Sequence, residues 1–341
     1  MAETTVHCTI DLDTPGKHVG RLELPRSNNT SGWSHQFIPI ISVKGEGSGP
    51  VAVVIGGVHG DEPEGQVAAL NLSRSATPEN VRGQLIIVPC ASMEASRDFT
   101  RLWPTGANLN RSFPGRPDGP ADEQLADFFS RYLFPRAEIV VDMHSGGRTM
   151  LCPEWSEMHW VDDPAQRKQM VDGMLAWNSP FHFVYIDVGG TGLLVGEAER
   201  QGKIVVSTEL GGGGHVHAHT HRIAQDGLAN VLRHFGVIDG APKSREELGL
   251  EPPVIVRATD MENYVFAPES GLWETFVDLG ARVKKGDAVG QMHFLERPDR
   301  PGTVVHAACD GIVAAVRAIA PTTQGDNVIV VGREIDAKEL L

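Results

Sequence analysis

The chain has 341 residues, which is long enough for a large hydrophobic core and predicts two domains. Its formal net charge of −14 argues against nucleic acid or an anionic membrane surface as a partner, but leaves room for a small cationic or zwitterionic substrate. The first residues carry no basic segment followed by an apolar run, and no stretch approaches about 18 consecutive apolar residues, so we expect neither a signal peptide nor a transmembrane helix.

Up to about residue 240, predicted strands alternate with predicted helices. Short alternating segments before residue 48 predict antiparallel edge strands at 18–24 and 36–43. Buried strands are expected next at 50–58, 85–89, 138–144, 182–187 and 203–210, and helices at 64–74, 122–134, 164–178, 192–201 and 218–235. The stretch 90–119 predicts a long loop, which inside a compact domain is usually functional. This order predicts an α/β fold with a mixed, mostly parallel sheet flanked by helices.

The pattern changes after residue 240. Residues 241–253 are charged and rich in proline and glycine, and therefore predict a linker. Short β runs with glycine turns fill 254–341, which predicts a small all-β domain. We therefore expect a catalytic domain over 1–240 that begins with edge strands over 1–48, then the linker, then a capping domain.

Two predicted strand ends carry residues that can bind a metal. The run V-V-I-G-G-V-H-G-D-E leads an apolar strand through a Gly-Gly turn to His59 and Glu62. Open α/β sheets place their binding sites at such carboxyl ends. His144, in V-V-D-M-H-S-G-G, follows another apolar strand. Each residue alone is typical of an ordinary loop, but two histidines and one glutamate with an open fourth position form the ligand set of a catalytic zinc.

Two further segments predict parts of an active site. Hydrolysis at a zinc site needs a base, and Glu209 follows the strand I-V-V-S-T and precedes four glycines, where a ligand can approach the backbone closely. The alternative for Glu209 is an ion-paired surface residue. In N-L-N-R-S-F-P-G, Asn110 and Arg111 can hold a carboxylate through an amide and a forked guanidinium. Spacing alone equally allows a loop in which asparagine side chains bond to their own backbone.

Taken in order, G-G-V-H-G-D-E, N-L-N-R-S-F-P-G, D-M-H-S-G-G and T-E-L-G-G resemble the motifs of the succinylglutamate desuccinylase/aspartoacylase family, which belongs to the zinc carboxypeptidase-like superfamily. The resemblance covers about residues 40–235. It implies one zinc ion per chain, held by His59, Glu62 and His144, with Glu209 as general acid/base.

The same resemblance implies how a substrate is bound. It assigns Asn110 and Arg111 to the substrate's carboxylate. It also implies an upstream arginine that polarises the scissile carbonyl, for which Arg101 is the nearest match and Arg97 the alternative. The family's Asn-Pro segment is replaced by Pro-Cys-Ala at 89–91, so the sequence does not decide which of the two arginines has this role.

The activity implied is that of a zinc-dependent amidohydrolase acting on a small N-acyl amino acid. The run N-L-N-R-S-F-P-G-R-P-D-G and the glycines after Glu209 are most similar to the N-acetyl-diaminobutyrate deacetylases of ectoine breakdown, although Asn108 stands where the family usually has aspartate. The alternatives are a desuccinylase or aspartoacylase acting on another N-acyl amino acid, a metallocarboxypeptidase, and a non-catalytic ligand-binding protein with a degenerate site. Such enzymes commonly oligomerise, which leaves a homo-oligomer open.

The spacing of the cysteines indicates the cellular compartment of the protein. Four of them are widely spaced without a C-x-x-C pair, at Cys8, Cys90, Cys152 and Cys309, and are expected to be reduced in a cytoplasmic protein.

A run of four histidines and the C-terminal segment remain open. H-V-H-A-H-T-H, at 215–221, allows a solvated turn, a substrate contact or a second metal site, and the first is the usual case for such tracts. The C-terminal segments resemble a biotinyl/lipoyl hammerhead, but no lysine stands between Gln291 and Cys309, so we expect a scaffold or cap instead of a carrier. Tyr264 can either reach the substrate or pack within a strand.

Overall fold

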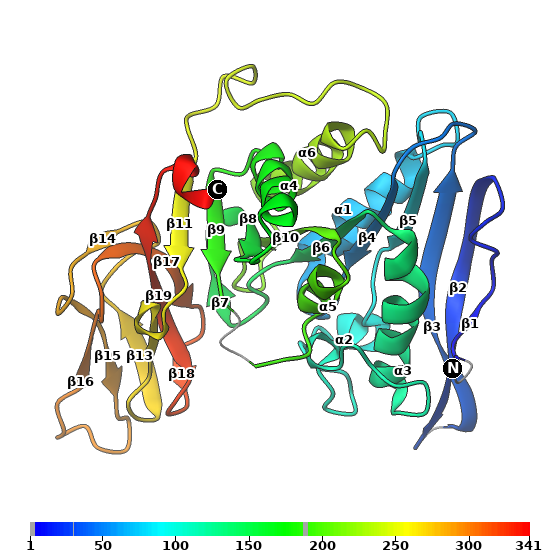
Figure 1. Cartoon of the computed structure of the whole chain (residues 1–341). Helices are drawn as coiled ribbons and strands as arrows, with labels where there is room; N and C mark the ends of the chain where they lie inside the picture. Colours follow the sequence, from blue (N-terminus) through cyan, green and yellow to red (C-terminus); the bar gives the residue numbers. More distant parts are fainter. Residues whose placement is uncertain (1–3, 30, 187–189) are drawn as a thin grey trace.

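The computed structural model describes residues 4–29, 31–186 and 190–341, and one mixed sheet of 15 strands runs across this part of the chain (Figure 1). Three antiparallel strands form one edge of the sheet: β1 (His7–Cys8), β2 (Gly16–Asn28) and β3 (Ser31–Lys44), of which β2 and β3 contain the two predicted edge strands. Residues 1–3 and 30 of the predicted edge segment, and residue 187 of a predicted strand, lie outside the described residues.

The centre of the sheet is parallel and buried on both faces. Its strands, in spatial order, are β5 (Gln84–Val88), β4 (Val51–Gly56), β6 (Ile139–His144) and β10 (Ile204–Leu210). Their near-continuous valine, isoleucine and leucine runs are typical of strands covered on both sides. Next to β10 the sheet continues with antiparallel β8 (Glu154–His159), then β9 (Phe181–Tyr185) parallel to it. The sheet is mixed, as predicted, but its parallel pairs are confined to the centre and to the strands that follow β8, and its edges are antiparallel.

Helices cover both faces of the sheet. On one face α1 (Pro63–Ser75) and α6 (Ala218–His234) pack against each other and over alternate residues of the central strands, with α4 (Pro164–Ala176) beside α6. On the other face, α3 (Ala121–Phe128) and α5 (Leu194–Arg200) bury the intervening residues. These five helices are the predicted ones. Helix α3 is shorter than expected, because the chain from Phe129 to Arg136 continues as a π turn and a 3₁₀ turn.

Four short elements were not expected from the sequence. The predicted loop 90–119 contains α2 (Met93–Asp98) and the 3₁₀ turn Leu109–Arg111. Both are too short to show helical periodicity. The strands β7 (Met150–Leu151) and β8 were also missed. Apolar and charged residues mix in β8 because it is buried on both faces, and one of its carboxylates, Glu157, lines a cavity.

The C-terminal strands continue the main sheet and add a second one. Strand β11 (Val254–Ala258) lies beside β9, and the sheet ends with β19 (Asn327–Glu334), β17 (Gly311–Arg317) and β14 (Arg282–Val283). Strand β12 (Tyr264–Phe266) pairs with β19, and β7 pairs with β17. The second sheet consists of β16 (Thr303–His306), β15 (Ala288–His293), β13 (Gly271–Thr275) and β18 (Pro321–Thr322).

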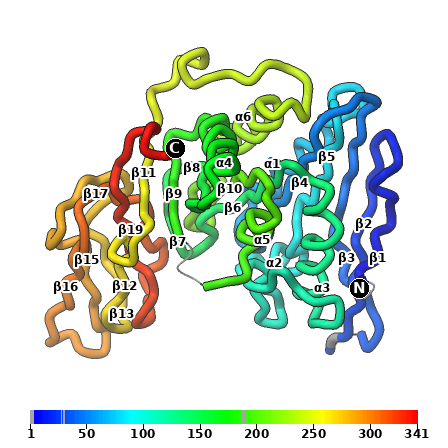
Figure 2. The backbone as a smooth tube through the Cα atoms, in the orientation of Figure 1, coloured from blue at the N-terminus to red at the C-terminus, as the bar shows by residue number. Residues whose placement is uncertain are grey.

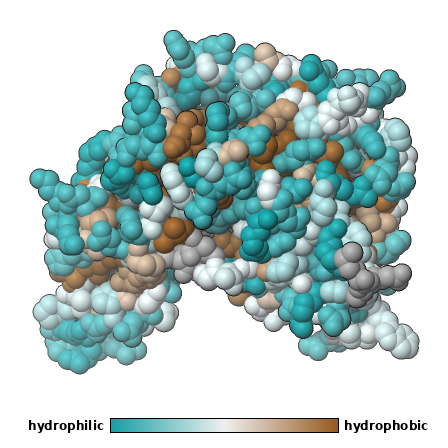
Figure 3. All heavy atoms as spheres, viewed as in Figure 1, coloured by the Kyte–Doolittle hydropathy of each residue, from teal (hydrophilic) through white to brown (hydrophobic). Residues whose placement is uncertain are grey.

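The predicted linker contains no helix or strand and runs as an arch outside α4 and α6 (Figure 2). Because the main sheet passes without a break from β9 to β11, the division into domains stays a prediction. In the space-filling view, the molecule is hollowed between the C-terminal strands and the rest of the chain (Figure 3). None of the helices in the described part of the chain has the length and apolar character of a membrane span.

Candidate active site

The candidate metal ligands meet where β4, β6 and β10 end. In the register of the parallel pair, Glu209 lies directly beside His144. His59 and Glu62 lie on the turn that links β4 to α1. This turn needs its glycine at position 56, because a Cβ atom there would lie 2.8 Å from the carbonyl oxygen of Gly65 in α1. The Gly-Gly sequence therefore lets the helix start close to the strand end and brings both ligands over the sheet.

Glu62 lies between two imidazoles. Its Oε1 atom is 2.7 Å from Nδ1 of His59, and its Oε2 atom is 2.7 Å from Nδ1 of His144. One ligand atom from each of the three residues lies within 4.8 Å of the others, and all three side chains are buried. The structure thus brings together the three residues proposed from the sequence.

The outer nitrogen of each imidazole is held by an oxygen. Nε2 of His59 lies 3.2 Å from Oδ1 of Asn108, and Nε2 of His144 lies 3.0 Å from Oδ2 of Asp142. If each Nε2–H donates to its oxygen, each Nδ1 lone pair faces a Glu62 oxygen. Two acceptors at 2.7 Å require a cation between them, either a proton or a metal ion. The donor set therefore fits a metal ion.

The electrostatics of the cluster agree with this arrangement. Burial would raise the pKa of the Glu62 carboxyl, but His59 and His144 hold it well below its usual range. Burial likewise opposes charge on His144, yet Asp142 and Glu62 raise the pKa of this imidazole well above its usual range. The Glu62 carboxylate thus stays ionised and ready to bind a cation.

Sequence reasoning missed the two residues that orient the imidazoles. Asp142 lies two residues before His144 on the same strand, so the alternation of a β-strand places both side chains on one face. This spacing was the signal that could have identified it. Asn108 was noted only as a departure from the family pattern. Its carbonyl oxygen supplies the acceptor for His59, and it also accepts from the backbone N–H of Asn110.

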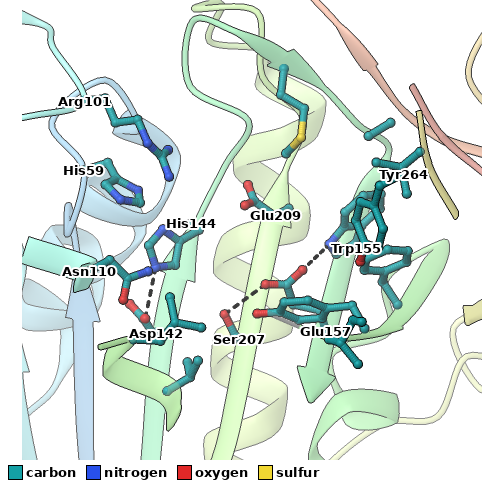
Figure 4. A pocket seen from close by; sticks show the side chains of 18 of the residues that line it. His59, Arg101, Asn110, Asp142, His144, Trp155, Glu157, Ser207, Glu209 and Tyr264 are labelled. Carbon is teal, nitrogen blue, oxygen red and sulfur yellow. Dashed lines mark hydrogen bonds and ion pairs between the residues drawn. The ribbon is translucent and has the colours of Figure 1, made fainter. Parts of the chain in front are cut away.

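A cavity of about 210 Å³ opens beside the cluster, and Glu209 lines it (Figure 4). The Oε2 atom of Glu209 is enclosed and has no hydrogen-bond partner among the described residues. Burial raises the pKa of this carboxyl well above its usual range, and the neighbouring carboxylates of Glu62 and Glu157 add to the effect. A carboxyl with a raised pKa and an oxygen that has no hydrogen-bond partner is suited to accept and return a proton.

Of the two candidate arginines, only Arg101 reaches the cavity. Its Nη1 atom donates to Oε1 of Glu62 at 3.0 Å. Arg97 is exposed at the end of α2 and lines a different hollow with Arg26 and Glu94. The geometry therefore favours Arg101, and the alternative is not supported.

Asn110 and Arg111 both line the cavity. The side-chain oxygen of Asn110 accepts from the backbone N–H of Leu194 at 2.8 Å, which leaves the amide NH₂ as the group that can bind an anion. Nη1 of Arg111 donates to the backbone carbonyl of Asn110 at 2.6 Å. The start of α5 thus anchors the loop, and the two side chains can present donors to a carboxylate.

The wall of the cavity away from the metal cluster is aromatic and was not foreseen. Trp155 and Glu157 come from β8, and Phe183 and Tyr185 from β9. Tyr264 reaches the cavity from the C-terminal strands and also donates its hydroxyl to the carbonyl of Ala258 at 3.0 Å. Tyr264 thus packs within the C-terminal part, as one alternative expected, and it also borders the cavity, so a contact with the substrate stays a prediction.

Comparison with known proteins identifies the family. A family model for the succinylglutamate desuccinylase/aspartoacylase catalytic domain matches residues 48–235. The chain belongs to this family. Over 333 residues, which are 97% of this chain and 96% of the relative, it is 36% identical to an N-alpha-acetyl-L-2,4-diaminobutyric acid deacetylase from Halomonas elongata.

Solved structures of family members are similar along the whole chain. The product-bound ectoine utilization protein EutE (DoeB) from Ruegeria pomeroyi superposes with a TM-score of 0.92 and 38% identity, over 98% of this chain and 100% of that one. A succinylglutamate desuccinylase/aspartoacylase from Rhodobacter sphaeroides gives a TM-score of 0.91 and 36% identity at the same coverage. The resemblance to the family, and within it to the diaminobutyrate deacetylases, is therefore confirmed.

Among the described residues, the histidine-rich run forms no group of three possible metal ligands. His215 and His217 precede α6, whereas His219 and His221 lie in its first turn, so the run is neither one strand nor one helix. The first three are exposed. Within the described ranges, only His59, Glu62 and His144 form a group of three that could hold a metal ion.

A buried carboxyl beside the cluster predicts how the stability of this family member depends on pH. Glu64 accepts from the Ser145 hydroxyl at 2.6 Å, and burial raises its pKa to about 7. The folded state keeps this proton up to about pH 7, whereas the unfolded chain releases it near pH 4.3, so stability falls as the pH rises through this window. Between about pH 5 and pH 8 the metal-free protein should lose about 2 kcal/mol relative to Glu64→Gln. The free energy of unfolding can be measured by urea denaturation at both pH values. An equal change with pH in the two proteins would contradict this prediction.

Proposed function

We propose that the chain is a zinc-dependent deacylase that hydrolyses the amide bond of a small N-acyl amino acid. The proposal rests mainly on the His59–Glu62–His144 cluster, which borders a cavity that is also lined by Glu209, whose Oε2 atom has no hydrogen-bond partner among the described residues. Two imidazole nitrogens and one carboxylate are the ligand set of a catalytic zinc. The similarity to a protein named as an N-alpha-acetyl-L-2,4-diaminobutyric acid deacetylase supports N-alpha-acetyl-L-2,4-diaminobutyrate as substrate, with diaminobutyrate and acetate as products.

The proposed mechanism assigns a task to each side chain. Zinc, when bound, lowers the pKa of a water toward about 7 and polarises a carbonyl oxygen. Glu209 takes the proton of the attacking water and then delivers it to the nitrogen of the leaving amine. Arg101 donates to the carbonyl oxygen as negative charge develops there. Asn110 and Arg111 hold the carboxylate of the substrate, so that the amide lies at the metal cluster.

The C-terminal strands have a role in this proposal as a cap of the hammerhead type over 254–341, attached to a catalytic domain over 1–240. Tyr264, Ala315 and Val330 belong to this part of the chain and close one side of the cavity. Such a cap favours a small N-acyl amino acid over the peptide that a carboxypeptidase would need to accommodate. The four cysteines form no disulfide, which supports a reducing compartment such as the cytoplasm.

The test is metal content on the purified protein, followed by release of free amine from a panel of N-acyl amino acids that includes both monoacetylated 2,4-diaminobutyrates. One zinc ion per chain and turnover of the α-acetyl isomer would support the whole proposal. Zinc with turnover of only acidic or aromatic N-acyl amino acids would retain the mechanism and reject this substrate. No zinc and no turnover would overturn it in favour of a ligand-binding protein.

A further inference from the structure

A second carboxylate lies in the cavity, away from the metal cluster. Glu157 is 5% exposed, and its place on β8 puts it opposite Ser207 of β10 on one side and Phe183 of β9 on the other. Its Oε2 atom accepts from the indole N–H of Trp155 at 2.7 Å, and its Oε1 atom accepts from the Ser207 hydroxyl at 3.3 Å. Figure 4 shows this carboxylate between Ser207 and Trp155.

Glu157 forms no ion pair with a described residue, although the imidazoles of His144 and His159 act on its charge from farther away. The ion pairs around the cavity join Glu62 and Asp142 to histidines or to Arg101, and none among the described residues reaches Glu157. Both hydrogen bonds to it come from neutral donors, although a carboxylate can accept about four. A buried carboxylate without a charged partner is costly unless a ligand supplies the charge. Burial accordingly raises the pKa of Glu157 in the ligand-free protein.

The surroundings of Glu157 suit an ammonium group. Trp155 stacks on Phe183 with ring centroids 4.5 Å apart, and Phe183 stacks on Tyr185 at 5.7 Å. These rings and Tyr264 line the same cavity. Aromatic rings attract cations through the negative charge on their faces, and a desolvated site strengthens that attraction. A carboxylate bordered by aromatic rings therefore matches an alkylammonium ion better than a neutral or acidic group.

We propose that Glu157 determines substrate specificity by binding the free ammonium group of an N-acylated diamino acid. The inference rests on the proposed function, in which the α-nitrogen is acylated and the side-chain amine is the substrate's only cation. His144 lies beside Glu209 of β10 and Glu157 beside Ser207 of the same strand, so the two are about 10 Å apart across the sheet and about 7 Å apart along it. The side chains of His144 and Glu157 both line the cavity, and the gap between them is about the length of a short diamino acid.

The experiment compares two substrates of equal shape, N-alpha-acetyl-2,4-diaminobutyrate and N-alpha-acetylnorvaline, in which a methyl group replaces the ammonium. The wild type should strongly prefer the diaminobutyrate. Glu157→Gln retains an oxygen for the Trp155 N–H but loses the charge. It should lower the ratio of kcat/KM for the two substrates by about 30- to 100-fold, mainly through KM, because one partner of a buried charge pair is removed. The matched control is Glu154→Gln, since Glu154 lies on the same strand but outside the cavity, where it accepts from Thr220.

Two results would overturn the assignment of Glu157. One is a folded Glu157→Gln protein with an unchanged ratio. The other is a wild type that hydrolyses both substrates equally well, which decides the question even if the variant does not fold. If the wild type hydrolyses neither, the proposed function fails separately. Calorimetric binding of 2,4-diaminobutyrate against norvaline to the wild type then tests the subsite by itself, and equal affinities would overturn it.

Discussion

Replacement of Glu209 by glutamine should lower kcat by about 1,000-fold or more while zinc remains bound, toward the upper end of the range for general acid–base catalysis. Glutamine has nearly the same shape but cannot accept a proton. Glu209 lines the cavity beside His144, yet it does not belong to the group of three candidate ligands. Metal binding and proton transfer should therefore separate in this variant.

The pH profile provides a second measurement of the same role. Burial and the nearby carboxylates raise the pKa of Glu209, and catalysis requires the deprotonated form to receive a proton. The wild-type kcat/KM should therefore rise with pH on its acidic limb, and the residual activity of Glu209→Gln should lack this limb. Glu154→Gln, outside the cavity, should leave kcat and the profile unchanged. Native turnover by a zinc-loaded Glu209→Gln protein would exclude Glu209 as the base.

The metal cluster could be predicted from the sequence because its residues follow uninterrupted apolar strands. The run from Val53 to Ile55 is buried on both faces, and glycines mark the point at which the strand ends. Parallel strands end at the same edge of a sheet, so His59, His144 and Glu209 had to lie near one another once their strands were neighbours. Local sequence patterns were therefore sufficient to predict that these side chains lie together, and the complete fold was not needed.

The aromatic wall could not be predicted in the same way. The segment Glu154–His159 mixes apolar and charged residues because β8 is buried on both faces and Glu157, on one of them, lines a cavity. Hydrophobic alternation cannot distinguish such a strand from a loop. The choice between Arg97 and Arg101 also required the structure. Phe99 has a left-handed conformation with φ of 52° and ends α2. The chain turns at this residue, so that Arg97 lies before the turn and Arg101 after it.

Asn108 shows how a departure from the family pattern can preserve a contact. An aspartate at this position would accept a hydrogen bond from Nε2 of His59 through a charged oxygen. The carbonyl oxygen of Asn108 accepts from the same atom without adding a further negative charge to Glu62 and Asp142. The sequence showed the substitution, but only the contact with His59 shows that the acceptor is retained.

Loss of one imidazole should abolish stoichiometric zinc. Partners that merely orient a ligand change metal affinity by about 10- to 100-fold, so removal of a direct ligand in His144→Ala should weaken zinc binding by about 1,000-fold or more. The variant also leaves Glu62 and Asp142 buried with one imidazole fewer. Zinc content after purification and competition with a chromophoric chelator measure the effect. His215→Ala is the matched control, because this exposed histidine belongs to no group of ligands in the described residues.

Thermal unfolding tests the same assignment without any catalytic readout. An ion that binds only the folded state adds about 4 kcal/mol of stability when its free concentration is 1,000 times Kd. A chelator should therefore lower the Tm of the wild type and of His215→Ala by several degrees, and should leave the Tm of His144→Ala unchanged, since that variant has little zinc to lose. If His144→Ala retained one zinc ion per chain and still responded to the chelator, the ion would have to bind elsewhere. In that case Glu62 and the two imidazoles would be a buried ion-pair network stabilised by protons instead of a metal.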